Sequence, residues 1–249
     1  MLIKMLRPMT GNWEQDEATV REIAETPTSA AKFALHAQVI LTLFNHRTHG
    51  TRFAPTLPGR SGLLRKVHDE LYPIAHFARL HFAAAEEVVI AWRDGDQNFD
   101  ATIEDRREGP NQSHLQYLEV TTLQDRDDAD LLKQLSKSER GVVNFEGDFE
   151  QAVHDRKVAL LRTALGTKGE KNYRPGTALL VYTDENRFRQ FSFGVPGHFI
   201  DKKASFSAVL AEMAPLLGVF AEVHVYSSDI VYGTIRPTPR PAEHDSRDA

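Results

Sequence analysis

The sequence contains no cysteine among its 249 residues. Disulfide bonds and zinc sites built on thiolates are therefore excluded. No apolar run approaches the roughly 20 residues that a membrane-spanning helix needs. The N-terminal stretch also lacks the sustained apolar segment and the small-residue cleavage site of a signal peptide. We therefore expect a cytoplasmic protein with no membrane partner.

Several short catalytic motifs are also absent. The sequence has 11 histidines, but none of them forms the H-E-x-x-H or H-x-x-E-H pattern of zinc hydrolases. It has no G-x-S-x-G nucleophile elbow, no P-loop and no G-x-G-x-x-G. These absences argue against a zinc hydrolase, a serine hydrolase of that type, an NTPase and a Rossmann dehydrogenase.

The charge balance limits which partners are plausible. The formal net charge is -5, with 26% charged and 41% hydrophobic residues, which is ordinary for a globular protein. A net negative chain does not coat nucleic acid non-specifically, although a local basic groove stays open. The loops 51–66 and 166–176 each carry several cations, and Phe53 and Tyr173 within them are candidates for base stacking.

Hydrophobic periodicity predicts an α/β fold with a mixed central sheet flanked by helices. Residues 1–60 are expected to be a helical extension packed on the core, 61–235 the core itself, and 236–249 a disordered tail. Within 63–87, Pro73 is expected to kink or split the helix. The expected helices are 28–47, 63–87, 128–138, 147–166 (ending at Gly166) and 203–220, and the expected strands lie in 88–92, 97–122, 177–183, 187–195 and 221–235.

The hairpin expected in residues 97–122 places acids beside its own apolar residues. Strand alternation puts Phe99, Ala101 and Ile103 on one face and Asp100 on the other. A turn centred between the neighbouring Gly109 and Pro110 would pair Asp100 with Glu119, with their Cβ atoms about 4.5–5.5 Å apart. Two carboxylates so close repel each other unless a cation lies between them or one is protonated. A hard divalent ion, Mg²⁺ or Mn²⁺, suits such oxygen ligands.

This pattern resembles the PD-(D/E)XK, or restriction-endonuclease-like, nuclease superfamily. Its signature is an Asp on one strand and a Glu-x-Lys on the antiparallel neighbour, within a core of helix, three strands, helix and strand. The resemblance implies that Asp100 and Glu119 bind the metal, that the backbone carbonyl of Val120 is a further ligand, and that Glu70 matches the acid often found on the first helix.

The motif departs from the family at one position, because Thr121 stands where the lysine is expected. That lysine positions the attacking water and stabilises charge in the transition state, and threonine can do only the first, weakly. Some members recruit a basic residue from the following helix instead. In the helix expected at 147–166, a periodicity of about 100° per residue places Arg156 in the middle of an apolar face and Lys157 at its edge. That face comprises Phe149, Val153, Leu160 and Ala164.

The expected function is therefore divalent-metal-dependent hydrolysis of phosphodiester bonds in nucleic acid. The alternative is a binding or regulatory protein that keeps the fold without cleaving, which the missing lysine and the acidic net charge favour. Asp100, Glu119 and the two basic residues of the next helix favour the enzyme. Nucleases of this type often pair to cut two strands, so a homodimer is also open.

Overall fold

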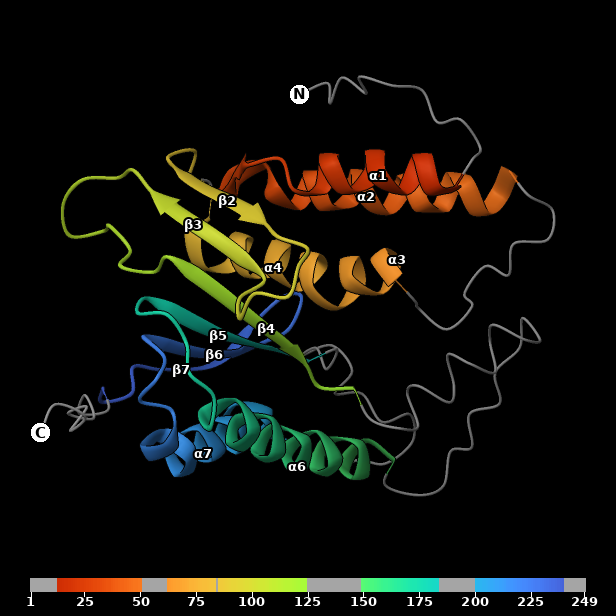
Figure 1. Cartoon of the computed structure of the whole chain (residues 1–249). Helices are drawn as coiled ribbons and strands as arrows, with labels where there is room; N and C mark the ends of the chain where they lie inside the picture. The colour runs from red at the N-terminus through yellow and green to blue at the C-terminus, as the bar shows by residue number, and fades with distance from the viewer. Residues whose placement is uncertain (1–12, 51–61, 84, 125–148, 184–199, 240–249) are drawn as a thin grey trace, which may run out of the picture.

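A seven-stranded mixed sheet forms the centre of the chain, as a computed structural model shows (Figure 1). The structure describes all residues except 1–12, 51–61, 84, 125–148, 184–199 and 240–249. The strands follow one another in chain order across the sheet: β1 (Thr28–Ser29), β2 (Val88–Trp92), β3 (Ala101–Asp105), β4 (Tyr117–Thr122), β5 (Thr177–Tyr182), β6 (Glu222–Tyr226) and β7 (Val231–Ile235). The expected α/β class is confirmed.

Helices cover both faces of the sheet (Figure 1). One face carries α1 (Trp13–Ala24), α2 (Ala30–Gly50) and the helical segment from α3 (Gly62–Lys66) to α4 (Tyr72–Phe77). The opposite face carries α6 (Phe149–Gly169) and α7 (Lys202–Met213), followed by the short 3-10 helix η4 (Ala214–Leu216). Each layer buries its own cluster of apolar side chains. Among the described residues, no helix has the length and apolar character needed to cross a membrane.

The sheet changes direction at β4. Strands β1 to β4 pair antiparallel, whereas β4, β5 and β6 run parallel and β7 returns antiparallel. Parallel neighbours need a crossover connection, usually a helix. Helices α6 and α7 lie in the two crossovers, from β4 to β5 and from β5 to β6. The strand β4 therefore lies where hairpin pairing gives way to crossover pairing.

The helical segment before β2 is interrupted near Pro73, as expected. Two π-helical turns, η1 (Val67–Leu71) and η2 (Ala78–Phe82), flank α4, and Pro73 is the second residue of α4. Proline has no N–H to donate into the helix, so a wider turn before it leaves fewer broken hydrogen bonds. The Tyr226 hydroxyl donates to the Pro73 carbonyl at 2.9 Å, which ties this interruption to the sheet.

Some expected boundaries are wrong. Helix α6 continues past Gly166 to Gly169, and the Glu170 N–H donates to the Gly166 carbonyl. An isolated glycine inside a helix is tolerated at a cost of about 1 kcal/mol, so it does not have to end one. Helix α7 is shorter than the expected 203–220, because the chain turns through η4 at its end. The helix expected at 128–138, the strand at 187–195 and residues 240–249 of the tail lie outside the described residues.

The end of α6 approaches η4 closely, and this contact requires a glycine. A Cβ atom at Gly169 would lie 2.8 Å from the backbone carbonyl oxygen of Leu216. A Cβ atom at Gly166 would meet only the flexible end of Met213, at an ordinary 3.8 Å. The two glycines of one helix therefore differ in what surrounds them.

We predict that Gly169→Ala lowers the free energy of unfolding by about 1–3 kcal/mol, the usual cost of forcing atoms into a packed site. The matched control, Gly166→Ala, should instead gain about 0.5–1 kcal/mol from its higher helix propensity. Urea unfolding of both variants checks the prediction. Equal effects of the two substitutions would contradict it.

Candidate active site

The register of the β3–β4 hairpin brings Asp100 and Glu119 together. Ala101 pairs with Leu118 and Thr102 pairs with Tyr117, which is the register expected from the sequence. Asp100 directly precedes β3, and its Oδ2 accepts a hydrogen bond from the Val120 N–H at 2.6 Å. The carboxylate of Asp100 thus takes the place of a backbone acceptor beside Glu119.

The two faces of β4 have different surroundings. Leu118 and Val120 are buried in the cluster beneath the α1–α4 layer. Because side chains alternate along a strand, Glu119 lies on the opposite face, toward α6, where it is 8% exposed. Thr121 lies on the same face as Glu119 and is half-buried. A carboxylate this well buried needs a partner to remain charged.

Lys168 and Tyr173 supply the partners of Glu119. The Lys168 ammonium forms an ion pair with Glu119 Oε1, and both side chains are largely buried. The Tyr173 hydroxyl donates to the same oxygen at 3.4 Å. Burial together with the charge of Glu119 raises the pKa of Tyr173 well above the usual range. The Tyr173 ring packs against Phe220 with the ring centroids 4.5 Å apart. Tyr173 therefore supports the site. It is not free for the base stacking that the sequence suggests.

Glu70 reaches the same region from the other helical layer. It lies on η1, and its Oε2 accepts a hydrogen bond from Trp92 Nε1 at 3.1 Å. Burial raises the pKa of Glu70, and the negative charge of Glu119 contributes in the same direction. Glu70 is thus within electrostatic reach of Glu119 and Asp100.

Asp100 has the most strongly perturbed carboxyl of this group. Burial, followed by the charges of Glu119 and Glu70, raises the pKa of Asp100 to about 7. The hydrogen bond from Val120 and the charge of Lys168 oppose this rise without cancelling it. Carboxyl groups that titrate near neutral pH because of burial and like charges are typical of functional sites.

The basic residues expected from α6 lie elsewhere. The buried face of α6 comprises His154, Lys157, Leu161 and Leu165. The face predicted from the sequence was centred on Arg156, which is one residue too early. Lys157 lies on the buried face itself, and its Nζ donates to the Leu123 carbonyl at 2.6 Å, just beyond β4. Arg156 is half-buried beside it. The cation beside Glu119 is Lys168, about three turns further along the helix.

Lys168 was missed because the sequence placed the end of the helix at Gly166. Continued at spacings of three and four residues, the buried series through Lys157, Leu161 and Leu165 reaches Lys168. That spacing is the signal in the sequence that identifies it. The position also fits the reach of a lysine side chain from the helix toward the sheet.

These carboxylates offer the hard oxygen donors that Mg²⁺ and Mn²⁺ prefer. In the described part of the chain, no group of three or more His, Cys, Asp or Glu side chains is arranged to hold a metal ion. Burial is the first cause of the raised pKa of Asp100, followed by the negative charges of Glu119 and Glu70, and a divalent cation would offset those charges. Asp100 and Glu119 carry oxygen donors of the kind that such an ion prefers, and Glu119 is paired with Lys168.

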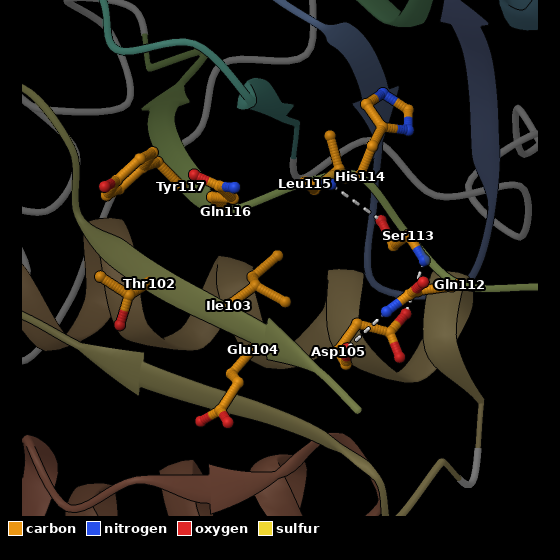
Figure 2. Close-up of a pocket in the computed structure, with 10 residues that line it drawn as sticks. All are labelled: Thr102, Ile103, Glu104, Asp105, Gln112, Ser113, His114, Leu115, Gln116 and Tyr117. Atoms are coloured by element: carbon orange, nitrogen blue, oxygen red, sulfur yellow. Dashed lines mark hydrogen bonds between the residues drawn. The ribbon is translucent and has the colours of Figure 1, made fainter. Parts of the chain in front are cut away.

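A depression beside the hairpin does not overlap this cluster. It lies between β3 and residues 112–116, where the strand pairing ends, and Thr102 and Tyr117 line one end (Figure 2). Asp105 at its other end accepts from the Ser113 N–H at 2.7 Å and pairs with Arg107 at 2.6 Å. The pKa of Asp105 falls to about 2, chiefly because of the Arg107 hydrogen bonds. Asp105 is therefore a structural anchor for the loop.

Comparisons of the chain with protein-family models, with curated proteins and with solved structures found no match. The functional argument therefore rests on the geometry of the site.

The elevated pKa of Asp100 makes a prediction about stability. Because this pKa lies above the aspartate value of 3.8, the folded state binds more protons than the unfolded chain between these two values. The stability contributed by this group is therefore fully present below about pH 4 and is lost as the pH rises through about 7. The Asp100→Asn variant keeps an acceptor for the Val120 N–H, but its side chain does not titrate. It therefore does not lose this stability as the pH rises.

We predict that Asp100→Asn gains free energy of unfolding relative to the wild type as the pH rises from about 4 to about 8, on the order of 1.4 kcal/mol per unit of pKa elevation. Urea unfolding at both pH values measures the gain. Glu104→Gln is the control, because Glu104 is exposed and its pKa is lowered by Arg106. If Asp100→Asn and Glu104→Gln show the same pH dependence, Asp100 does not titrate as described.

Proposed function

We propose that the protein is a divalent-metal-dependent nuclease of the PD-(D/E)XK type that hydrolyses phosphodiester bonds in nucleic acid. The observation that carries the proposal is the position of Lys168. Its ammonium lies on Glu119, beside Asp100, and so supplies the cation that Thr121 cannot supply. The lysine of the motif would have moved from the strand to the helix that follows it.

The order of the elements supports the proposal. A helical segment precedes three antiparallel strands, β2, β3 and β4, and α6 then leads to β5, which is parallel to β4. This order is similar to the helix, three strands, helix and strand that the resemblance implies. Asp100 directly precedes β3, Glu119 lies within β4 and Glu70 lies on the helical segment before β2, which is close to the pattern of acids that the resemblance implies.

Each side chain has a role in this chemistry. Asp100 and Glu119 would hold the metal ion, with Glu70 and the Val120 carbonyl as further donors, and the bound ion would polarise the phosphoryl group and acidify water. Lys168 would stabilise the charge that develops on the phosphoryl oxygens. Thr121, on the same face, would help to orient water. Lys157 lies near the end of β4, where it donates to the Leu123 carbonyl, and Lys157 and Arg156 would act on the substrate strand.

A second candidate is a protein that binds nucleic acid without cleaving it. The ion pair between Lys168 and Glu119 favours this candidate, because it already neutralises one carboxylate of the site. The described residues also hold no preformed three-ligand group. The two candidates differ in whether Mg²⁺ or Mn²⁺ binds and whether the backbone is cut.

We predict that Mn²⁺ and Mg²⁺ raise the melting temperature of the wild type and start the cleavage of plasmid DNA or of RNA. Stabilisation of about 2.7 kcal/mol is expected when the free ion is at about 100 times its Kd. Asp100→Asn should abolish both effects. Lys168→Met should lower the cleavage rate by about 10²–10³-fold, the usual loss for one group that stabilises transition-state charge.

Two matched controls separate the site from the general loss of charge. Glu104→Gln removes an exposed acid from β3, and Lys171→Met removes an exposed lysine close to Lys168. Both should keep the cleavage rate and the thermal shift of the wild type. If neither ion shifts the melting temperature of the wild type and no substrate is cut, the nuclease is excluded and the binding protein remains.

A further inference from the structure

An exposed arginine lies across two aromatic rings at the edge of the site. The guanidinium carbon of Arg174 is 5.1 Å from the ring centroid of Phe99 and 5.3 Å from that of Tyr117. The two rings are themselves in contact, with centroids 4.9 Å apart. Both distances are within the roughly 6 Å over which a cation is attracted to the face of an aromatic ring.

Each member of this cluster lies close in the chain to a residue of the site. Phe99 directly precedes Asp100, Tyr117 lies two positions before Glu119, and Arg174 directly follows Tyr173. The sequence had placed Phe99 on the face of Ala101 and Ile103. Its ring packs on Tyr117 instead, because Phe99 precedes β3 and strand alternation does not extend to it.

The loop that carries Arg174 is fixed at two points. The side-chain amide of Asn98 donates to the Asn172 carbonyl at 2.8 Å. Gly176, with a φ of +78°, accepts backbone hydrogen bonds from Gln116 and Tyr117 at 2.9 and 3.3 Å. The position of Arg174 relative to β3 and β4 is therefore set by the fold.

The guanidinium of Arg174 pairs with no carboxylate among the described residues. The two arginines that follow β3 do pair: Arg106 contacts Glu104 and Arg107 contacts Asp105. An exposed guanidinium held against two aromatic rings is suited to bidentate contact with a carboxylate or a phosphate. In a nuclease, the anion that lies beside the reacting phosphate is the neighbouring phosphate of the same backbone.

We propose that Arg174 is a positioning residue that binds a backbone phosphate of the nucleic acid next to the bond at Asp100 and Glu119. This inference rests on the proposed function. Phe99 and Tyr117 hold the arginine through cation–π contacts. The contact recognises the charge and spacing of the phosphates and does not depend on the base sequence.

Binding without cleavage tests this proposal. The fluorescence anisotropy of labelled duplex DNA and labelled single-stranded RNA is titrated with the full chain in EDTA, over a series of salt concentrations. Arg174→Met keeps the aliphatic stem and removes the charge. It should weaken binding of at least one probe about tenfold and reduce the slope of log K against log salt by about 0.7–0.9, the value of one phosphate contact.

Arg162→Met is the control, because Arg162 is an exposed arginine of α6 that pairs with Glu212 away from β3. It should leave the affinity and the salt slope at their wild-type values. Equal effects of the two substitutions, or no change in slope with Arg174→Met, would overturn the proposal. Failure of the wild type to bind either probe would overturn it as well.

A second measurement needs no variant. Phenylglyoxal modifies accessible guanidinium groups, and mass spectrometry locates the products. Bound probe should protect Arg174 and leave Arg162 reactive, and an unprotected Arg174 would contradict the proposal. Because EDTA removes the metal, these results are independent of hydrolysis. Protection of Arg174 without any cleavage would support the phosphate contact and reject the nuclease. Cleavage with Arg174 unprotected would support the nuclease and reject the phosphate contact.

Discussion

The close approach of partly buried carboxylates is the interaction on which the site depends. Asp100 and Glu119 come from neighbouring segments of the hairpin, and Glu70 approaches them from the first helical layer. Repulsion between neighbouring carboxylates is unfavourable without compensation, and it is stronger where water is partly excluded. The protein compensates in two ways: Lys168 neutralises Glu119, and Asp100 has a pKa near neutrality. The remaining negative charge is what a divalent cation would offset.

The architecture explains why the compensating cation comes from α6. Because β4 and β5 are parallel, the chain must cross over between them, and α6 covers the face of β4 that carries Glu119. Lys168 lies one residue before the end of this helix, where Gly169 allows close contact with Leu216. The loop after the helix then returns past Glu119 with Tyr173 and Arg174. The same crossover thus brings three side chains to the edge of the site.

The sequence predicted the features that depend on local patterns. Alternation along the two strands and the Gly109–Pro110 turn predicted the register of the hairpin, and hence the meeting of Asp100 and Glu119. The features that depend on tertiary contacts were not predicted. The buried face of α6 includes Lys157 and His154, which hydrophobic periodicity counts as polar. Gly166 does not end the helix, because an isolated glycine within a helix costs only about 1 kcal/mol. For these two reasons the sequence predicted Arg156 in place of Lys168.

The most direct test of this account is the titration of the Asp100 carboxyl group by carbon NMR, with and without Mg²⁺. Asn substitution at position 100 assigns the signal. The account predicts a midpoint near pH 7 in the metal-free protein, and a fall of that midpoint when Mg²⁺ is added, because the ion favours the charged form. A midpoint close to that of an ordinary aspartate, about 3.9, unchanged by Mg²⁺, would contradict it.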